Sequence, residues 1–370
     1  MALLLPNAVL PAVAAAPDDT VAIKVNGTAI SGWTDLTLTV DIESMPRVFR
    51  LGATALNGGV PAKAGDPCVV SIGADTVLTG NIDIDDGGGD FGSHDFNLTG
   101  RGACADLVDC AAQWPGGQIS GSNALAVTSK LAQAYNISAY AAPGADLGPV
   151  IPQFNLNFGE KAFDIIERVT AFAGLLAYED AAGKVVLSQV GTTKAASGAV
   201  YGQNVLKRRV TNSLAARFAS YACSMLPVDT MGDIGGSPIF FTATDGGVPR
   251  PRLMYIVADA IAGGQDLCRR RALWEAARRF GRGTKVEVTV DSWRDSAGAL
   301  WTPNTLVPVS LPELRTPGGT ADMLLSRIVF RYGAQGKKLA DLTLMPPAAF
   351  QVLQVPIVPV AADLTPSSGS

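Results

Sequence analysis

The stretch His94–Ala112, HDFNLTGRGACADLVDCAA, separates two kinds of sequence pattern. Phe96 and Leu98 alternate with polar residues, which is typical of a half-buried strand. After Gly102 the apolar residues, beginning with Leu107, follow the spacing of a short amphipathic helix. The residues before this stretch have strand patterns and those directly after it have helical patterns, so we place a domain boundary at residue 102.

The residues before this boundary predict a small antiparallel β-barrel over 17–102. Asn26-Gly27 follows the alternating run Val21–Val25 and supplies the two positive φ values of a type I′ hairpin turn. Further alternating runs, separated by turns such as Gly87-Gly88-Gly89, continue to Leu98. Five or six short strands in so short a region are typical of a small barrel or sandwich.

The residues after the boundary predict a compact α/β domain over 103–204, with two helices and a hairpin. From Val205 the alternating pattern returns and predicts a second barrel over 205–232 and 283–350. An inserted segment, 233–282, carries an arginine-rich helix, Gln265–Phe280. We expect its apolar face, which includes Leu273 and Trp274, to pack inward and its arginines to point outward.

The last strands of the two β-regions align with each other. Leu78, Ile82 and Asp95–Leu98 correspond to Leu324, Ile328 and Asp341–Leu344 at an offset of 246 residues. Upstream, Val69–Ile72 matches Leu306–Val309 if the turn of the second copy, Pro312–Gly319, is nine residues longer. This pattern predicts an internal duplication. The predicted fold class is therefore β-rich α+β, with two related small antiparallel β-barrels, an α/β domain and an inserted helical segment.

The sequence lacks the patterns of common catalytic and metal sites. His94 is the only histidine, and there is no Gly-x-Ser-x-Gly elbow, no P-loop and no glycine-rich turn opening a helix. Glu160, Asp164 and Glu167 share a helical face, but basic residues lie among them, as on a solvated surface. Five cysteines form no Cys-x-x-Cys pair, which favours reduced thiols over disulfides or metal ligands. We predict no enzyme activity, no catalytic residues, no metal and no cofactor.

Both ends of the chain have unusual compositions. Residues 1–16 are apolar but have no basic start, and Pro6 and Pro11 interrupt the run. These features favour an extended N-terminal arm that packs on a neighbouring subunit, and they argue against a secretion signal. Residues 351–370 are rich in Ala, Pro and Ser and predict an extended tail. Elsewhere the sequence has no apolar run of 18 residues, so it predicts no membrane-spanning helix.

Five segments of the chain form a recognisable series: VNGTAISGW (25–33), VLTGNIDI (77–84), GRGACADLVDC (100–110), CRRRALWEAARRFGRG (268–283) and DSWRDSAGALWTPNTLVPV (291–309). Together they resemble the baseplate hub proteins of Mu-like contractile phage tails. Their order matches the family, and they extend over most of residues 20–345. The first 16 residues and the tail have no counterpart in the resemblance.

The resemblance implies a structural protein of the virion tail baseplate, assembled in the host cytoplasm. It implies a homotrimer whose two barrels per subunit form a pseudo-sixfold ring. Such a ring joins the sixfold tail tube protein to the threefold central spike protein and contacts other baseplate proteins. The hub part of type VI secretion spikes has a related fold.

Charge suggests how such a ring would be held together. Residues 1–150 carry a net charge of −9 and residues 200–350 a net charge of +7. We expect these halves to attract each other between subunits, with Arg269, Arg270 and Arg279 as possible subunit-interface residues. DNA passing through the lumen, without specific binding, is a competing use for these arginines.

Two other classes of function remain open. A tail-associated cell-wall hydrolase would need a carboxylate pair, and a secreted carbohydrate-binding β-protein would need solvent-facing aromatic platforms. The chain has only five tryptophans, and Trp274 is expected on the apolar face of a helix, which counts against the second class.

Overall fold

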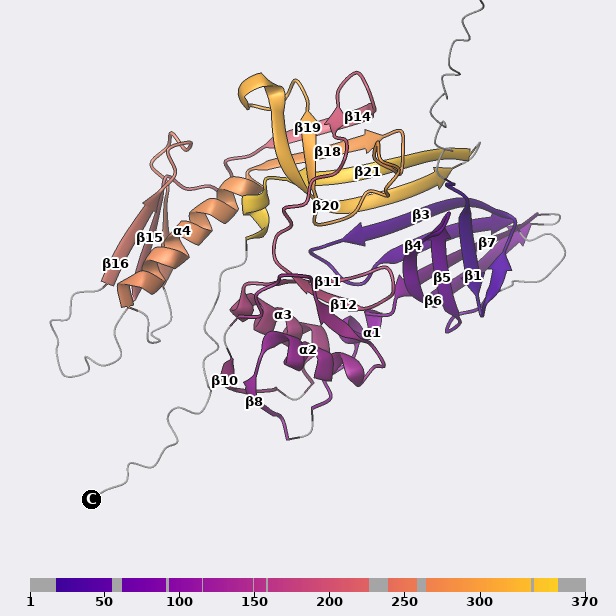
Figure 1. Cartoon of the computed structure of the whole chain (residues 1–370), viewed down its shortest axis with the longest axis horizontal. Helices are drawn as coiled ribbons and strands as arrows, with labels where there is room; N and C mark the ends of the chain where they lie inside the picture. The colour runs from indigo at the N-terminus through magenta and orange to yellow at the C-terminus, as the bar shows by residue number, and fades with distance from the viewer. Residues whose placement is uncertain are drawn as a thin grey trace, which may run out of the picture.

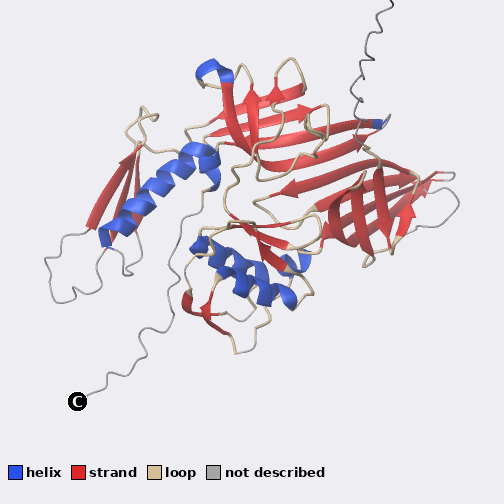
Figure 2. Cartoon of the chain, viewed as in Figure 1, coloured by secondary structure: helices blue, strands red, loops and turns tan. Residues whose placement is uncertain are grey.

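The computed structural model describes residues 18–54, 62–90, 93–114, 116–148, 150–157, 159–225, 239–257, 264–333 and 336–351. The predicted arm (1–16) and all but the first residue of the predicted tail (351–370) lie outside these residues. As predicted, the described chain is a β-rich α+β protein with few helices (Figure 2). A large sheet forms one side, and an α/β domain and a small sheet with a long helix are attached to it (Figure 1).

The first β-region contains seven strands, drawn in indigo to violet in Figure 1. They are β1 (Val21–Val25), β2 (Thr28–Ile30), β3 (Trp33–Asp41), β4 (Val48–Thr54), β5 (Pro67–Ile72), β6 (Asp75–Asp90) and β7 (Ser93–Gly102). Asn26 and Gly27 have φ values of 51° and 78°, and Val25 pairs with Thr28. The predicted hairpin turn is therefore confirmed.

The second β-region contributes the remaining strands of the same sheet. They are β13 (Ala199–Val200), β14 (Val205–Asn212), β18 (Thr284–Val290), β19 (Leu306–Ser310), β20 (Thr320–Gly333) and β21 (Lys337–Met345). The main path of the sheet runs β14-β18-β21-β20-β3-β4-β7-β6-β5-β1-β2, and β19 and β13 extend from β20.

The expected two separate barrels are not confirmed, because strand β20 pairs with strands of both regions. Its first part, through Leu324, pairs with β19, and its second part, Arg327–Tyr332, pairs with β3 of the first region. One buried apolar cluster extends across both regions and includes Leu38, Trp293 and Phe330. Within the described residues no strand pairing closes either region, so the two regions share one sheet and one core.

The two regions nevertheless repeat the same strand order. The order β3-β4-β7-β6-β5 in the first region corresponds to β14-β18-β21-β20-β19 in the second. The strands aligned by sequence are thus topological equivalents. The constant offset of 246 does not hold for the hairpin register, however, because Asp95 pairs with Gly88 whereas Asp341 pairs with Val329. The partner of Asp341 therefore lies five residues earlier in β20 than the offset predicts.

The α/β domain follows β7 and has its own buried core. Its elements are α1 (Ala105–Asp109), β8 (Gln118–Ser122), α2 (Ala124–Gln133), β9 (Ala139–Ala141), β10 (Ile151–Asn155), α3 (Ala162–Ala173), β11 (Leu176–Glu179) and β12 (Val185–Ser188). Asn123 caps α2 by accepting a hydrogen bond from the backbone N–H of Ala126, and Gly174 ends α3 in the left-handed conformation.

A buried carboxylate fixes this domain to the first β-region. Glu179 is 1% exposed, and its two oxygens accept hydrogen bonds from the backbone N–H groups of Arg47 (2.7 Å) and Cys104 (2.9 Å). The Arg47 guanidinium donates to the carbonyls of Glu179 and Val77. A Cβ atom at Gly102 would lie 2.1 Å from the Glu179 carboxylate, so glycine is required there. Burial raises the pKa of Glu179 and lowers that of Arg47.

The inserted segment is larger than expected. Strand β15 (Ser220–Met225) leaves the large sheet and pairs with β16 (Ile239–Thr244) and β17 (Leu253–Val257), so the insertion begins near residue 213 rather than at 233. Helix α4 (Gly264–Arg282) covers this small sheet (Figure 1). The short helices η2 (Pro317–Gly319) and η4 (Pro347–Phe350) complete the described elements.

The predicted inward face of α4 is wrong at Leu273, which is 47% exposed. The buried line instead consists of Cys268, Ala272 and Glu275. Two of these side chains are small, which lets the helix backbone approach the three-stranded sheet closely. The Trp274 indole is half-buried and donates to the carbonyl of Gln351.

Replacing Glu179 with Gln should destabilise the fold although the shapes match. An amide nitrogen would then face one of the two N–H donors, which leaves a buried donor unsatisfied and costs about 1–3 kcal/mol. Chemical denaturation followed by tryptophan fluorescence measures the change. Glu167→Gln, at an exposed glutamate of the same domain, is the matched control and should change stability by less than about 0.5 kcal/mol. Equal stability of the two variants would contradict the assigned role.

Candidate assembly interface

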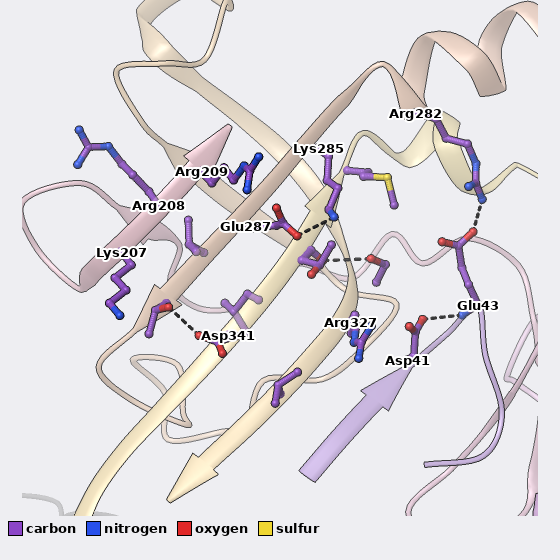
Figure 3. A pocket seen from close by; sticks show the side chains of 17 residues that line it. Asp41, Glu43, Lys207, Arg208, Arg209, Arg282, Lys285, Glu287, Arg327 and Asp341 are labelled. Atoms are coloured by element: carbon purple, nitrogen blue, oxygen red, sulfur yellow. Dashed lines mark hydrogen bonds and ion pairs between the residues drawn. The ribbon is translucent and has the colours of Figure 1, made fainter. Parts of the chain in front are cut away.

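The face of the large sheet opposite the core carries a charged groove. Residues of β14, β18, β21 and β20 line it, and Asp41 and Glu43 lie at one side (Figure 3). The cavity measures about 720 Å³. Its charged lining consists of Lys207, Arg208, Arg209, Arg282, Lys285, Arg327, Asp41, Glu43, Glu287 and Asp341. Cations outnumber anions in this groove.

The anions of the groove are already engaged within the chain. Glu287 pairs with Lys285 at 2.6 Å, and Glu43 pairs with Arg282. Asp341 accepts from the Thr289 hydroxyl (2.6 Å) and pairs with Arg331 (2.7 Å).

Three cations remain after these pairs are formed. Lys207, Arg209 and Arg327 make no ion pair with the described residues. In the described part of the chain, the unpaired positive charge of the groove therefore lies on β14, at Lys207 and Arg209, and on β20, at Arg327.

Strand β6 of the first β-region contains an acidic segment, Asp83–Asp86. Asp83 of β6 pairs with Arg101, which also reaches Asp109 at 2.6 Å. Beyond Asp83, the side chains of Asp85 and Asp86 are exposed, and Ile84 is 55% exposed. The Asp85 carboxylate accepts from the backbone N–H of Ala64, and Asp86 has no ion pair among the described residues.

The structure separates the three predicted interface arginines. Arg279 is half-buried and bonded within its own segment, to Glu275 (2.9 Å) and to the carbonyl of Ala216 (3.1 Å). Arg269 and Arg270 lie on the exposed side of α4. Arg269 and Arg270 are therefore more exposed to solvent than Arg279.

The sequence interpretation missed the cations of β14. Lys207-Arg208-Arg209 is a run of three basic residues inside a segment predicted to be a strand. Consecutive charges on a strand mean that both faces are polar, which is a signature of a sheet edge. That signal was available in the sequence without the structure.

The remaining features of the described residues concern reactive thiols, metal-binding groups and membrane-spanning helices. Cys68, Cys104, Cys110, Cys223 and Cys268 are free thiols. Burial raises the pKa of Cys68 to about 12. Among the described residues, no group of three or more His, Cys, Asp or Glu side chains could hold a metal ion. No helix in the described part of the chain is long and apolar enough to cross a membrane.

Comparison with family models gives three matches along the chain. Residues 20–102 match the N-terminal domain of Mu phage baseplate assembly protein GpP-like, and residues 104–189 match the second domain of baseplate hub protein gp44-like. Residues 264–353 match the fourth domain of Mu phage baseplate assembly protein GpP. Together the matches extend over well more than half of the chain.

Individual relatives agree with these models. Baseplate hub protein gp44 of Escherichia phage Mu is 29% identical over 357 residues, covering 93% of this chain and 91% of that protein. The 43 kDa tail protein of prophage MuSo2 from Shewanella oneidensis has a TM-score of 0.80 at 27% identity, covering 89% of this chain and 98% of that one. The type VI secretion component c3393 of E. coli shares the fold, with a TM-score of 0.58 at 11% identity over 90% of this chain and 80% of that one.

The fold, the repeated strand order and these matches define a structural component of a phage-tail baseplate. Within that class, the chain belongs to the baseplate hub proteins of Mu-like phage tails. The resemblance inferred from five sequence segments is thereby confirmed.

Proposed function

We propose that this hub protein acts as a homotrimeric ring that joins the sixfold tail tube to the threefold central spike. The repeated order β3-β4-β7-β6-β5 and β14-β18-β21-β20-β19 is the observation that carries the proposal. Three chains with two equivalent sheet regions each supply six similar units. Such a ring matches a sixfold tube on one side while keeping the threefold symmetry of the trimer.

The proposed role is structural and non-enzymatic. The α/β domain and the α4 segment are attached to the sheet at different connections, after β7 and between β14 and β18. Each occurs once per chain, so a trimer presents three copies of each. These copies are suited to contact a threefold spike and other baseplate proteins. DNA would pass through the lumen of the ring without specific recognition.

The exposed arginines of α4 are proposed to contribute to the subunit contact. Arg269 and Arg270 belong to the basic half of the chain, and a neighbouring subunit would offer the acidic half. Arg279 bonds to Glu275 and to the Ala216 carbonyl within its own segment, so the proposed contact rests mainly on Arg269 and Arg270.

The oligomeric mass in solution tests the ring. Analytical ultracentrifugation or light scattering of the full chain should give three times the chain mass of 38.2 kDa. A monomer over the whole concentration range, at low and moderate salt, would contradict the proposed function.

Charge reversal tests the two arginines. The double variant Arg269→Glu, Arg270→Glu should weaken the trimer at low salt, and the difference from the wild type should shrink at high salt because exposed charges are screened. Arg250→Glu reverses an exposed charge of the same inserted segment and is the matched control. Assembly of the double variant unchanged at low salt would rule out this contact. Tight, salt-sensitive DNA binding by the isolated protein would instead assign these arginines to the lumen.

A further inference from the structure

We infer that β14 of one subunit pairs antiparallel with the C-terminal half of β6, Ile84–Asp90, of a neighbouring subunit. This inference rests on the proposed trimeric ring and specifies how its subunits join. An equivalent contact already exists within one chain, where β20 of the second region pairs with β3 of the first. The proposed joint repeats that contact with the equivalent strands.

The equivalence follows from two parallel sets of pairings. In the first region, Leu38 of β3 pairs with Phe49 of β4, and Phe49 pairs with Gly100 of β7. Gly100 in turn pairs with Ile82 of β6. The second set runs from Val210 of β14 through Val286 and Leu344 to Leu325 of β20. A bulge follows Ile82 in β6 and Leu325 in β20. Val210 therefore occupies the position of Leu38, and the segment after each bulge is equivalent.

Both strands have an edge available for pairing. β14 is the terminal strand on the main path of the sheet, and in the described residues only β18 runs alongside it as a strand. β6 pairs with β5 only up to Asn81, so the edge of Ile84–Asp90 opposite β7 has no strand partner in the described chain. Unpaired edge strands expose backbone donors and acceptors that readily accept another strand.

The register of the intrachain joint predicts the register between subunits. Within one chain, Val329 pairs with Thr39 and Phe330 pairs with Leu38. Asp86 is equivalent to Val329 and Thr211 is equivalent to Thr39, so Asp86 of β6 lies opposite Thr211 of the neighbouring β14. In the same way, Gly87 lies opposite Val210. Arg209 then lies diagonal to Asp86 on the same face of the joined sheet.

Charge and exposure support this pairing over pairing of like strands. The β14 strand carries Lys207 and Arg209 without ion-pair partners in the described residues, and the β6 segment carries exposed Asp85 and Asp86. Two β14 strands would bring cations together, and two β6 segments would bring carboxylates together. The heterologous pair alone is attractive, and a heterologous contact repeated about a threefold axis closes a ring of three subunits. Each strand also exposes a large apolar side chain, Ile84 at 55% and Leu206 at 58%.

Cysteine cross-linking tests the joint directly. The full-length double variant Asp86→Cys, Thr211→Cys is treated with a short bismaleimide and separated under denaturing conditions. Covalent dimers and trimers, with no longer ladder, are expected. The wild type and both single variants, treated in the same way, account for the five native thiols, of which only Cys110 is not buried.

A matched pair within one chain controls for the chemistry. Thr39→Cys, Val329→Cys joins residues that are already paired, so it should cross-link within the subunit and produce no dimers. The native mass of every variant is measured before cross-linking. A trimer without covalent dimers would overturn the β6–β14 joint and leave the proposed ring standing. A monomeric wild type would overturn both.

A charge exchange gives a second measurement that does not depend on cysteine reactivity. Asp86→Lys or Arg209→Glu alone should weaken trimer formation about tenfold, because each places like charges beside each other in the joint. The double variant Asp86→Lys, Arg209→Glu should recover assembly to within about threefold of the wild type. Single variants that assemble like the wild type, or losses that simply add in the double variant, would overturn the joint.

Discussion

The pairing of β20 with β3 is the contact on which the large sheet depends. These strands belong to opposite ends of the chain, yet Arg327–Tyr332 runs along Leu36–Asp41 as one continuous ladder. Because β20 is 14 residues long and β19 covers only its first part, the rest of its edge is available to β3. The ladder joins the two regions into one sheet over a single core.

A second link supports the same arrangement at another point. The Arg294 side chain is 7% exposed and donates to the carboxylates of Asp19 (2.7 Å) and Asp75 (2.8 Å). It also reaches the carbonyls of Asp18, Ile72 and Gly298. Planar guanidinium geometry lets one side chain satisfy several acceptors in a buried position. The two regions are thus tied by charge as well as by backbone pairing.

Sequence patterns predicted local structure better than the relations between distant strands. Alternation predicted most strands and Asn26-Gly27 predicted the correct hairpin turn. The change from strand to helix pattern after Gly102 corresponds to the end of β7 and the start of α1. The strand-level repeat was visible because buried positions alternate similarly in both copies. The shared sheet was not visible, since nothing in β3 or β20 alone indicates which edge each will use. The Glu179 contact joins residues far apart in sequence and was missed for the same reason.

The charged residues show the same limit. Arg269, Arg270 and Arg279 look alike in the sequence, but Arg279 is committed to Glu275 one turn earlier in the helix. The cations of β14 were overlooked because a strand with both faces polar has no hydrophobic pattern that draws attention. Their importance depends on β14 being the last strand of the sheet, which is a property of the topology and not of the local residues.

The covalent connection between the two sheet regions has a consequence for assembly kinetics. In the proposed ring of six units, each of the three chains would form one β20–β3 joint as it folds, at an effective concentration fixed by the connecting chain. Only the three joints between subunits depend on the protein concentration. Dilution would therefore separate the proposed ring into intact two-unit arcs, because folding of each chain would precede ring closure.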